Sequence, residues 1–151
     1  MDATQDTAVE RFVPHRGGML WLTRVLHVDE DGADVEAIVR EDHLLADPEA
    51  DGLPAWVGIE YMAQAIAAGA GLSARDNGET AARMGFLLGC RDLAIAVDSF
   101  QVGDRLTIEA RRSFGENELG VFACKVQRGD EVVVEGALTV YQGPLPQEMT
   151  R

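Results

Sequence analysis

The sequence predicts an α+β fold in which one helix packs against an antiparallel sheet. The first observation is a nearly uncharged segment, residues 55–72, which is rich in Ala and Gly and contains Glu60 as its single charged residue. The second is that apolar residues alternate with polar ones in segments before and after it, with short turn sequences between them. A helix on the surface would show a polar stripe, so we expect this helix to be buried by the sheet.

Size and composition indicate a single domain. The chain has 151 residues, and we expect one domain over residues 1–151 with an ordered core at about 9–142. Its 13 Lys and Arg against 26 Asp and Glu give a net charge of −13. This charge argues against nucleic acids and anionic membranes as partners. The sequence has no long apolar run and begins with acidic residues, so we expect no membrane span, no signal peptide and a cytoplasmic location.

The segments before the helix predict a hairpin and a loop. Residues 19–28 form an apolar stretch that suits a strand, residues 29–32 have turn chemistry, and residues 33–40 alternate as a second strand. Residues 41–52 are expected to be a loop. Pro54 then suits the first turn of the helix, where no backbone N–H is needed.

The segments after the helix predict a run of antiparallel strands. We expect strands at residues 85–97, with a bend at Gly89, and at 105–114. Residues 119–127 and 131–141 are separated by a Gly-containing turn and form a further hairpin.

Glu60 is the strongest candidate for acid–base chemistry. Burial of an ionised carboxylate costs on the order of several kcal/mol. Burial therefore raises the pKa of the carboxyl group and favours its protonated form. A carboxyl group that holds a proton near neutral pH can act as a general acid. The alternative is that Glu60 only complements the positive end of the helix dipole. Gln64, one helical turn later, shares its face and can orient the carboxyl group.

The three histidines offer candidate bases. His15 lies in a lead-in segment, His27 in the first predicted strand and His43 in the loop before the helix. None has the spacing of a metal site with another histidine, and the two cysteines are far apart in the sequence. Motifs of nucleotide-binding loops and serine hydrolases are missing as well. We therefore expect no metal and no cofactor.

Three segments resemble the β-hydroxyacyl-(acyl carrier protein) dehydratases. Residues 13–16 (VPHR), followed by an apolar stretch, are similar to their Leu-Pro-His-Arg lead-in. Residues 53–64 (LPAWVGIEYMAQ) are similar to their Met-Pro-Gly-Val-x-x-x-Glu-x-Met-Ala-Gln signature, and residues 100–106 (FQVGDRL) to Val-x-Pro-Gly-Asp-x-Leu. The Leu-Pro-Ala-Trp start of the second segment resembles most closely the single-domain dehydratases of aryl-polyene pathways.

This resemblance implies the hotdog fold and a lyase activity. Enzymes of the family convert 3-hydroxyacyl thioesters on acyl carrier protein to trans-2-enoyl thioesters, in fatty acid or aryl-polyene biosynthesis, without a cofactor. They work as dimers whose sites take a His from one subunit and an acidic residue from the other. A homodimer or a heterodimer with another hotdog subunit is therefore expected.

The chain departs from the family at the catalytic histidine. The family has His-Phe-Pro-Gly shortly before the helix, whereas residues 45–52 of this chain contain no histidine. Our hypothesis is that His15 supplies the imidazole as the base, with His43 as its rival and Glu60 as the acid. The resemblance also assigns a set of residues to substrate binding: Leu53, Ala55, Trp56, Gly58 and Gln64.

Other activities share this fold and stay open at this point. A hotdog thioesterase would use Glu60 to activate water without any histidine. A non-catalytic subunit of a heterodimeric dehydratase would explain the missing histidine, and a plain acyl-binding protein would leave the thioester unchanged.

Overall fold

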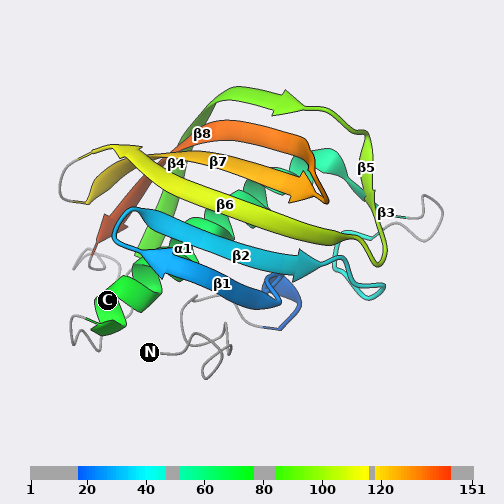
Figure 1. Ribbon diagram of the computed structural model, residues 1–151, viewed down its shortest axis with the longest axis horizontal. Helices are drawn as coiled ribbons and strands as arrows, with labels where there is room; N and C mark the ends of the chain where they lie inside the picture. Colours follow the sequence, from blue (N-terminus) through cyan, green and yellow to red (C-terminus); the bar gives the residue numbers. More distant parts are fainter. Residues whose placement is uncertain (1–16, 47–51, 77–83, 116–117, 144–151) are drawn as a thin grey trace, which may run out of the picture.

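A six-stranded antiparallel sheet curves around one long helix, α1 (Gly58–Asp76), in the computed structural model (Figure 1). The structure describes residues 17–46, 52–76, 84–115 and 118–143. The strand order is β1-β2-β6-β7-β8-β4. The strands are β1 (Arg24–Asp29), β2 (Gly32–Ile38), β4 (Met84–Ile95), β6 (Arg105–Phe114), β7 (Leu119–Arg128) and β8 (Glu131–Gly143). The predicted α+β architecture is confirmed.

The core lies between α1 and the inner face of the sheet. Alternate residues of the central strands are fully buried there, as the period of two in their sequences requires. Examples are Val35, Leu106, Ile108, Val126 and Leu138. Each buried side chain of this size contributes about 1.5–3 kcal/mol.

The sequence predicts that the helix is buried on all sides, but one side of it is only partly covered. Tyr61, Met62 and Ala65 are buried, whereas Ala63 and Ala67 are only half-buried. Because these two alanines are one helical turn apart, they form a narrow stripe that the sheet does not cover.

The first strand begins later than predicted. The apolar stretch starts at Met19, but β1 begins at Arg24. Residues Gly17–Met19 form a short 3₁₀ helix, η2. The backbone groups of Met19 and Trp21 bond the side chain of Gln64 instead of a neighbouring strand, so this part of the chain is tied to α1.

A second, two-stranded sheet fixes the start of the helix. β3 (Gly52–Pro54) pairs with β5 (Ser99–Gln101), and neither strand is predicted from the sequence. The prediction that Pro54 opens the helix is wrong, because Pro54 is extended and ends β3. Beyond this pairing, the Ala55 N–H donates to the Asp98 carbonyl at 3.0 Å. The chain then passes through the 3₁₀ helix η3 (Ala55–Val57) directly into α1.

The predicted bend in the strand after the helix is confirmed as a bulge. The register of β4 against β8 shifts between Leu87 and Gly89, and again between Arg91 and Ala94. β4 forms the outer edge of the sheet beside β8. No helix in the described parts of the chain combines the length and apolar character needed to cross a bilayer.

Gly52→Ala should destabilise the fold, because a Cβ at this position would lie 2.0 Å from the Phe100 carbonyl oxygen across the β3–β5 pair. We expect a loss of about 2 kcal/mol or more in the free energy of unfolding, measured by urea denaturation. Gly89→Ala is the matched control, since a Cβ there meets nothing within 4 Å. Equal stability of the two variants would contradict the close approach of β3 to β5.

Candidate active site

The side chain of Gln64 is the polar centre of the site. It is fully buried on α1. Its Oε1 accepts a hydrogen bond from the Trp21 N–H at 3.0 Å, and its Nε2 donates to the Met19 carbonyl at 2.8 Å. Nε2 also donates to Glu60 Oε1 at 3.0 Å. The amide thus joins the chain before β1 to the helix and to the candidate acid.

Glu60 lies in the first turn of α1 and is half-buried. The predicted pairing with Gln64 across one helical turn is confirmed by the 3.0 Å contact. The amide donor restricts the orientation of the carboxyl group, and the positive end of the helix dipole acts on it. A positioned carboxyl of this kind can donate or accept a proton at a bound ligand.

The residues assigned to substrate binding surround the helix start but have different environments. Leu53 and Ala55 are buried, and Gly58 packs so closely on Val134 that a Cβ would lie 2.9 Å from its Cγ2. Trp56 is 58% exposed. The Ala55 N–H bonds Asp98 and the Gly58 N–H bonds the carbonyls of Ala55 and Trp56, so the N–H groups between them are the candidates for a ligand.

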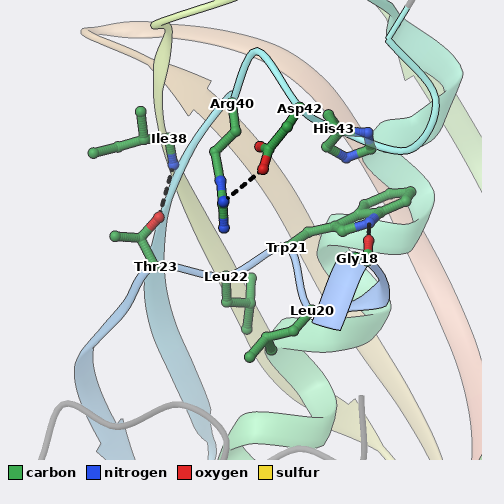
Figure 2. Close-up of a pocket in the computed structure, with 9 residues that line it drawn as sticks. All are labelled: Gly18, Leu20, Trp21, Leu22, Thr23, Ile38, Arg40, Asp42 and His43. Atoms are coloured by element: carbon green, nitrogen blue, oxygen red, sulfur yellow. Dashed lines mark hydrogen bonds and ion pairs between the residues drawn. The ribbon is translucent and has the colours of Figure 1, made fainter. Parts of the chain in front are cut away.

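A pocket of about 510 Å³ opens beside the chain that leads into β1 (Figure 2). One wall comes from residues that precede β1, and the other from the end of β2 and the loop after it. Its lining consists of Gly18, Leu20, Trp21, Leu22, Thr23, Ile38, Arg40, Asp42 and His43. Arg40 and Asp42 form an exposed ion pair at 2.8 Å within it.

Four aromatic rings form a cluster behind this pocket. The Trp21 ring centroid is 4.3 Å from that of His43 and 5.3 Å from that of Tyr61. Tyr61 also contacts Phe100 on β5, with the centroids 6.2 Å apart. Burial raises the pKa of Tyr61, so the hydroxyl stays protonated. No local pattern in the sequence predicts this cluster, because its rings come from the segment before β1, a loop, the helix and β5.

His43 is suited to be a donor rather than a base. Its Nδ1 accepts a hydrogen bond from the Leu45 N–H at 3.1 Å, so in the neutral ring the proton must be on Nε2. Burial lowers the pKa of His43, which favours this neutral form. His27 is exposed on β1, and its Nε2 lies 3.1 Å from Asp29 Oδ2. His15 lies outside the described residues, so its assignment as the base stays a prediction.

No group of three or more potential metal-ligating His, Cys, Asp or Glu side chains occurs among the described residues. The two cysteines, Cys90 and Cys124, are free thiols. Burial raises the pKa of the Cys124 thiol to about 12, so it is unreactive near neutral pH.

Comparison with known proteins places this architecture in one family. The pattern of the ApeP-like family, described as ApeP dehydratase, matches residues 7–151. The chain is similar to the structure "The Dehydratase Heterocomplex ApeI:P from Xenorhabdus doucetiae", with 28% identity, a TM-score of 0.86, and coverage of 94% of this chain and 95% of that chain. The expected hotdog fold and the resemblance to dehydratases of the aryl-polyene branch are confirmed.

More distant structures share the fold alone. An uncharacterised protein, PH1136 from Pyrococcus horikoshii, is 19% identical with a TM-score of 0.63, over 91% of this chain and 94% of that one. A probable thioesterase from Bartonella henselae is 15% identical with a TM-score of 0.55, over 77% and 93%. The comparison with curated proteins finds no match.

Gln64→Leu should lower stability, because it leaves the buried Trp21 N–H and the Met19 carbonyl without their partner. We expect a loss of about 2 kcal/mol or more in the free energy of unfolding, measured by urea denaturation. Gln101→Leu, which changes an exposed glutamine on β5, is the matched control. An unchanged midpoint for Gln64→Leu would show that the amide does not hold the lead-in segment.

Protonation of His43 should oppose folding, since its pKa is lower in the folded chain than the ordinary value of about 6.5. Stability should therefore rise with pH up to about 6.5 and fall below it as the ring gains a proton. Urea denaturation of the wild type and of His43→Asn at about pH 5 and pH 8 measures this contribution. The free energy of unfolding should differ less between the two pH values in His43→Asn than in the wild type. The control His27→Asn should keep the part of this difference that is due to His43.

Proposed function

The chain belongs to the ApeP-like dehydratase family, and we propose that it acts on a 3-hydroxyacyl thioester attached to an acyl carrier protein. The reaction removes water and gives the trans-2-enoyl thioester, in aryl-polyene-type or fatty acid biosynthesis. The observation that carries this proposal is the half-buried Glu60 in the first turn of α1, held by the buried amide of Gln64.

The elimination needs a base, an acid and hydrogen-bond donors for the thioester carbonyl. The base takes the proton from C2, the electrons of that bond form the C2–C3 double bond, and the hydroxyl leaves C3. Glu60 in its protonated form gives the hydroxyl its second hydrogen, so that it leaves as water. The N–H groups at the start of the helix are suited to polarise the carbonyl. These steps use groups of the protein and need no cofactor.

His15 is our candidate for the base. His43 donates from Nε2 in its neutral form and is therefore poorly suited to remove a proton with that atom. His15 precedes Met19 by four residues, and the Met19 carbonyl bonds the same amide nitrogen as Glu60. Four residues span at most about 14 Å even when extended, and Gly17–Met19 form the shorter 3₁₀ helix η2, so the chain length allows an imidazole at His15 to lie near the Glu60 carboxyl.

We further propose that a second hotdog subunit completes the enzyme. β4 has no strand beyond it in the described sheet, and four large apolar side chains on it are exposed: Leu87, Leu88, Leu93 and Ile95. An edge of this kind invites pairing with another strand. The similar structure from Xenorhabdus doucetiae is a heterocomplex. A net charge of −13 makes pairing of two identical chains costly, which favours a different and less acidic subunit.

The compartment that fits these features is the cytoplasm. Both cysteines are free thiols. Free thiols persist in a reducing compartment.

Glu60→Gln and His15→Ala should each lower the turnover of a 3-hydroxyacyl thioester by about 10²–10⁴-fold, because each removes a group that transfers a proton. Turnover is followed by the enoyl absorbance and by the mass loss of one water. The matched controls are Glu109→Gln on β6 and His27→Ala on β1, which should keep wild-type turnover.

Full turnover of His15→Ala in a folded protein would contradict its role. Release of free thiol from a saturated acyl thioester would indicate a thioesterase instead. If the wild-type chain is inactive alone and gains turnover with a second hotdog protein, the chain is one subunit of a heterodimeric dehydratase.

A further inference from the structure

Two buried polar atoms of the aromatic cluster lack hydrogen-bond partners. They are the Tyr61 hydroxyl oxygen and His43 Nε2, and no partner for either occurs in the described part of the chain. The rings that carry them both contact Trp21, and their own centroids are 6.4 Å apart. Tyr61 is fully buried. The two atoms therefore lie in one small region of the protein.

Both atoms present a hydrogen to this region. The Tyr61 hydroxyl is a donor, and the Leu45 N–H bond to Nδ1 leaves the proton of a neutral His43 on Nε2. Buried donors without acceptors destabilise a protein, and phenylalanine would fill the site of Tyr61 without this cost. Unsatisfied groups of this kind point to an acceptor that binds during function.

The pocket beside the cluster supplies a place for the ligand that carries this acceptor. Trp21 and His43 belong both to the cluster and to the pocket wall (Figure 2). Leu20, Leu22 and Ile38 give part of the pocket an apolar lining, and the rest of its wall includes the Arg40–Asp42 ion pair. A pocket that combines apolar walls with a few polar groups is typical of a site for a small ligand.

The pocket is close to the Glu60 carboxyl but does not include it. Glu60, Gln64 and Tyr61 are not among its lining residues, and Tyr61 packs behind the wall against Trp21. The Gln64 amide connects the two places, since it bonds Glu60 on one side and the Trp21 N–H on the other. A ligand whose reacting carbons meet Glu60 would therefore place a more remote part in the pocket.

We propose that this pocket binds an apolar chain of the substrate and that Tyr61 and His43 donate hydrogen bonds to a carbonyl or hydroxyl oxygen on it, remote from the reacting carbons. The inference rests on the proposed dehydratase function. Two parts of the substrate can provide this oxygen: the tail of the acyl group, or the amide carbonyls of the pantetheine arm. In either case Tyr61, which lies behind the pocket wall next to His43, is then a specificity residue.

The test is the substitution Tyr61→Phe, with Tyr141→Phe, at the other tyrosine of the chain, as the matched control. Binding of unreactive saturated acyl thioesters is measured by titration calorimetry, so the result does not depend on turnover. The acyl groups are compared with and without an oxygen at the tail, and each is attached to pantetheine or to the shorter N-acetylcysteamine. Thermal denaturation is measured in parallel.

Tyr61→Phe should unfold at the wild-type temperature or above it, because it removes an unsatisfied hydroxyl. The variant should nevertheless bind the thioester that carries the accepting oxygen about three- to tenfold more weakly than the wild type does. A loss confined to oxygen-bearing tails assigns the oxygen to the acyl group, and a loss confined to pantetheine thioesters assigns it to the arm. His43→Asn keeps an acceptor for the Leu45 N–H but has no atom at the place of Nε2. This variant should also bind the same thioester more weakly than the wild type does.

Equal binding of all four thioesters by Tyr61→Phe and the wild type would overturn the inference. A drop in unfolding temperature would do so as well, because it would mean that the hydroxyl has a partner within the protein. Wild-type turnover of a 3-hydroxyacyl thioester is measured separately, so a failure of the proposed reaction is distinguished from a failure of this site.

Discussion

The hydrogen bonds of the Gln64 amide are the constraint on which the site depends. A side-chain amide has one acceptor atom and two donor hydrogens, and Gln64 uses both kinds: it accepts from Trp21 and donates to Met19 and Glu60. A glutamate at this position would oppose its charge to Glu60 and to a carbonyl, and a lysine would have no acceptor for the Trp21 N–H. The choice of glutamine thus follows from the three groups around it.

This amide also explains how the outer parts of the molecule meet the helix. Because Met19 and Trp21 are tied to α1, the chain crosses the helix before it enters β1 at Arg24. On the N-terminal side of α1, the β3–β5 pair holds the residues that lead into the helix. Glu60 therefore lies in a segment fixed from two sides, by side-chain hydrogen bonds and by a backbone ladder. Such rigidity is what a proton-transfer group needs to keep its geometry.

The sequence predicted the parts of the fold that depend on local patterns. Alternation over residues 105–114 matches β6, and the turn at Gly103 has the positive φ that its glycine allows. The pairing of Glu60 with Gln64 followed from helical spacing. Strands of three residues, as in β3 and β5, have too few alternations to reveal a period. The apolar stretch from Met19 looked like a strand because its competing partner, Gln64, lies 45 residues away. Likewise, the contact of Trp21 with His43 and Tyr61 exists only once three separate segments have packed together.

The charges of the chain place a further condition on the enzyme as a whole. Several of its cations are already committed to ion pairs within the described residues: Arg24 with Glu36, Arg40 with Asp42, Arg111 with Asp34, Lys125 with Glu109 and Arg128 with Asp104. With a net charge of −13, the chain as a whole would repel an acidic carrier protein. In the enzyme proposed above, a second subunit would then do more than cover β4. A less acidic subunit would also supply positive charge for the proposed carrier protein, which a copy with the same net charge would supply less well.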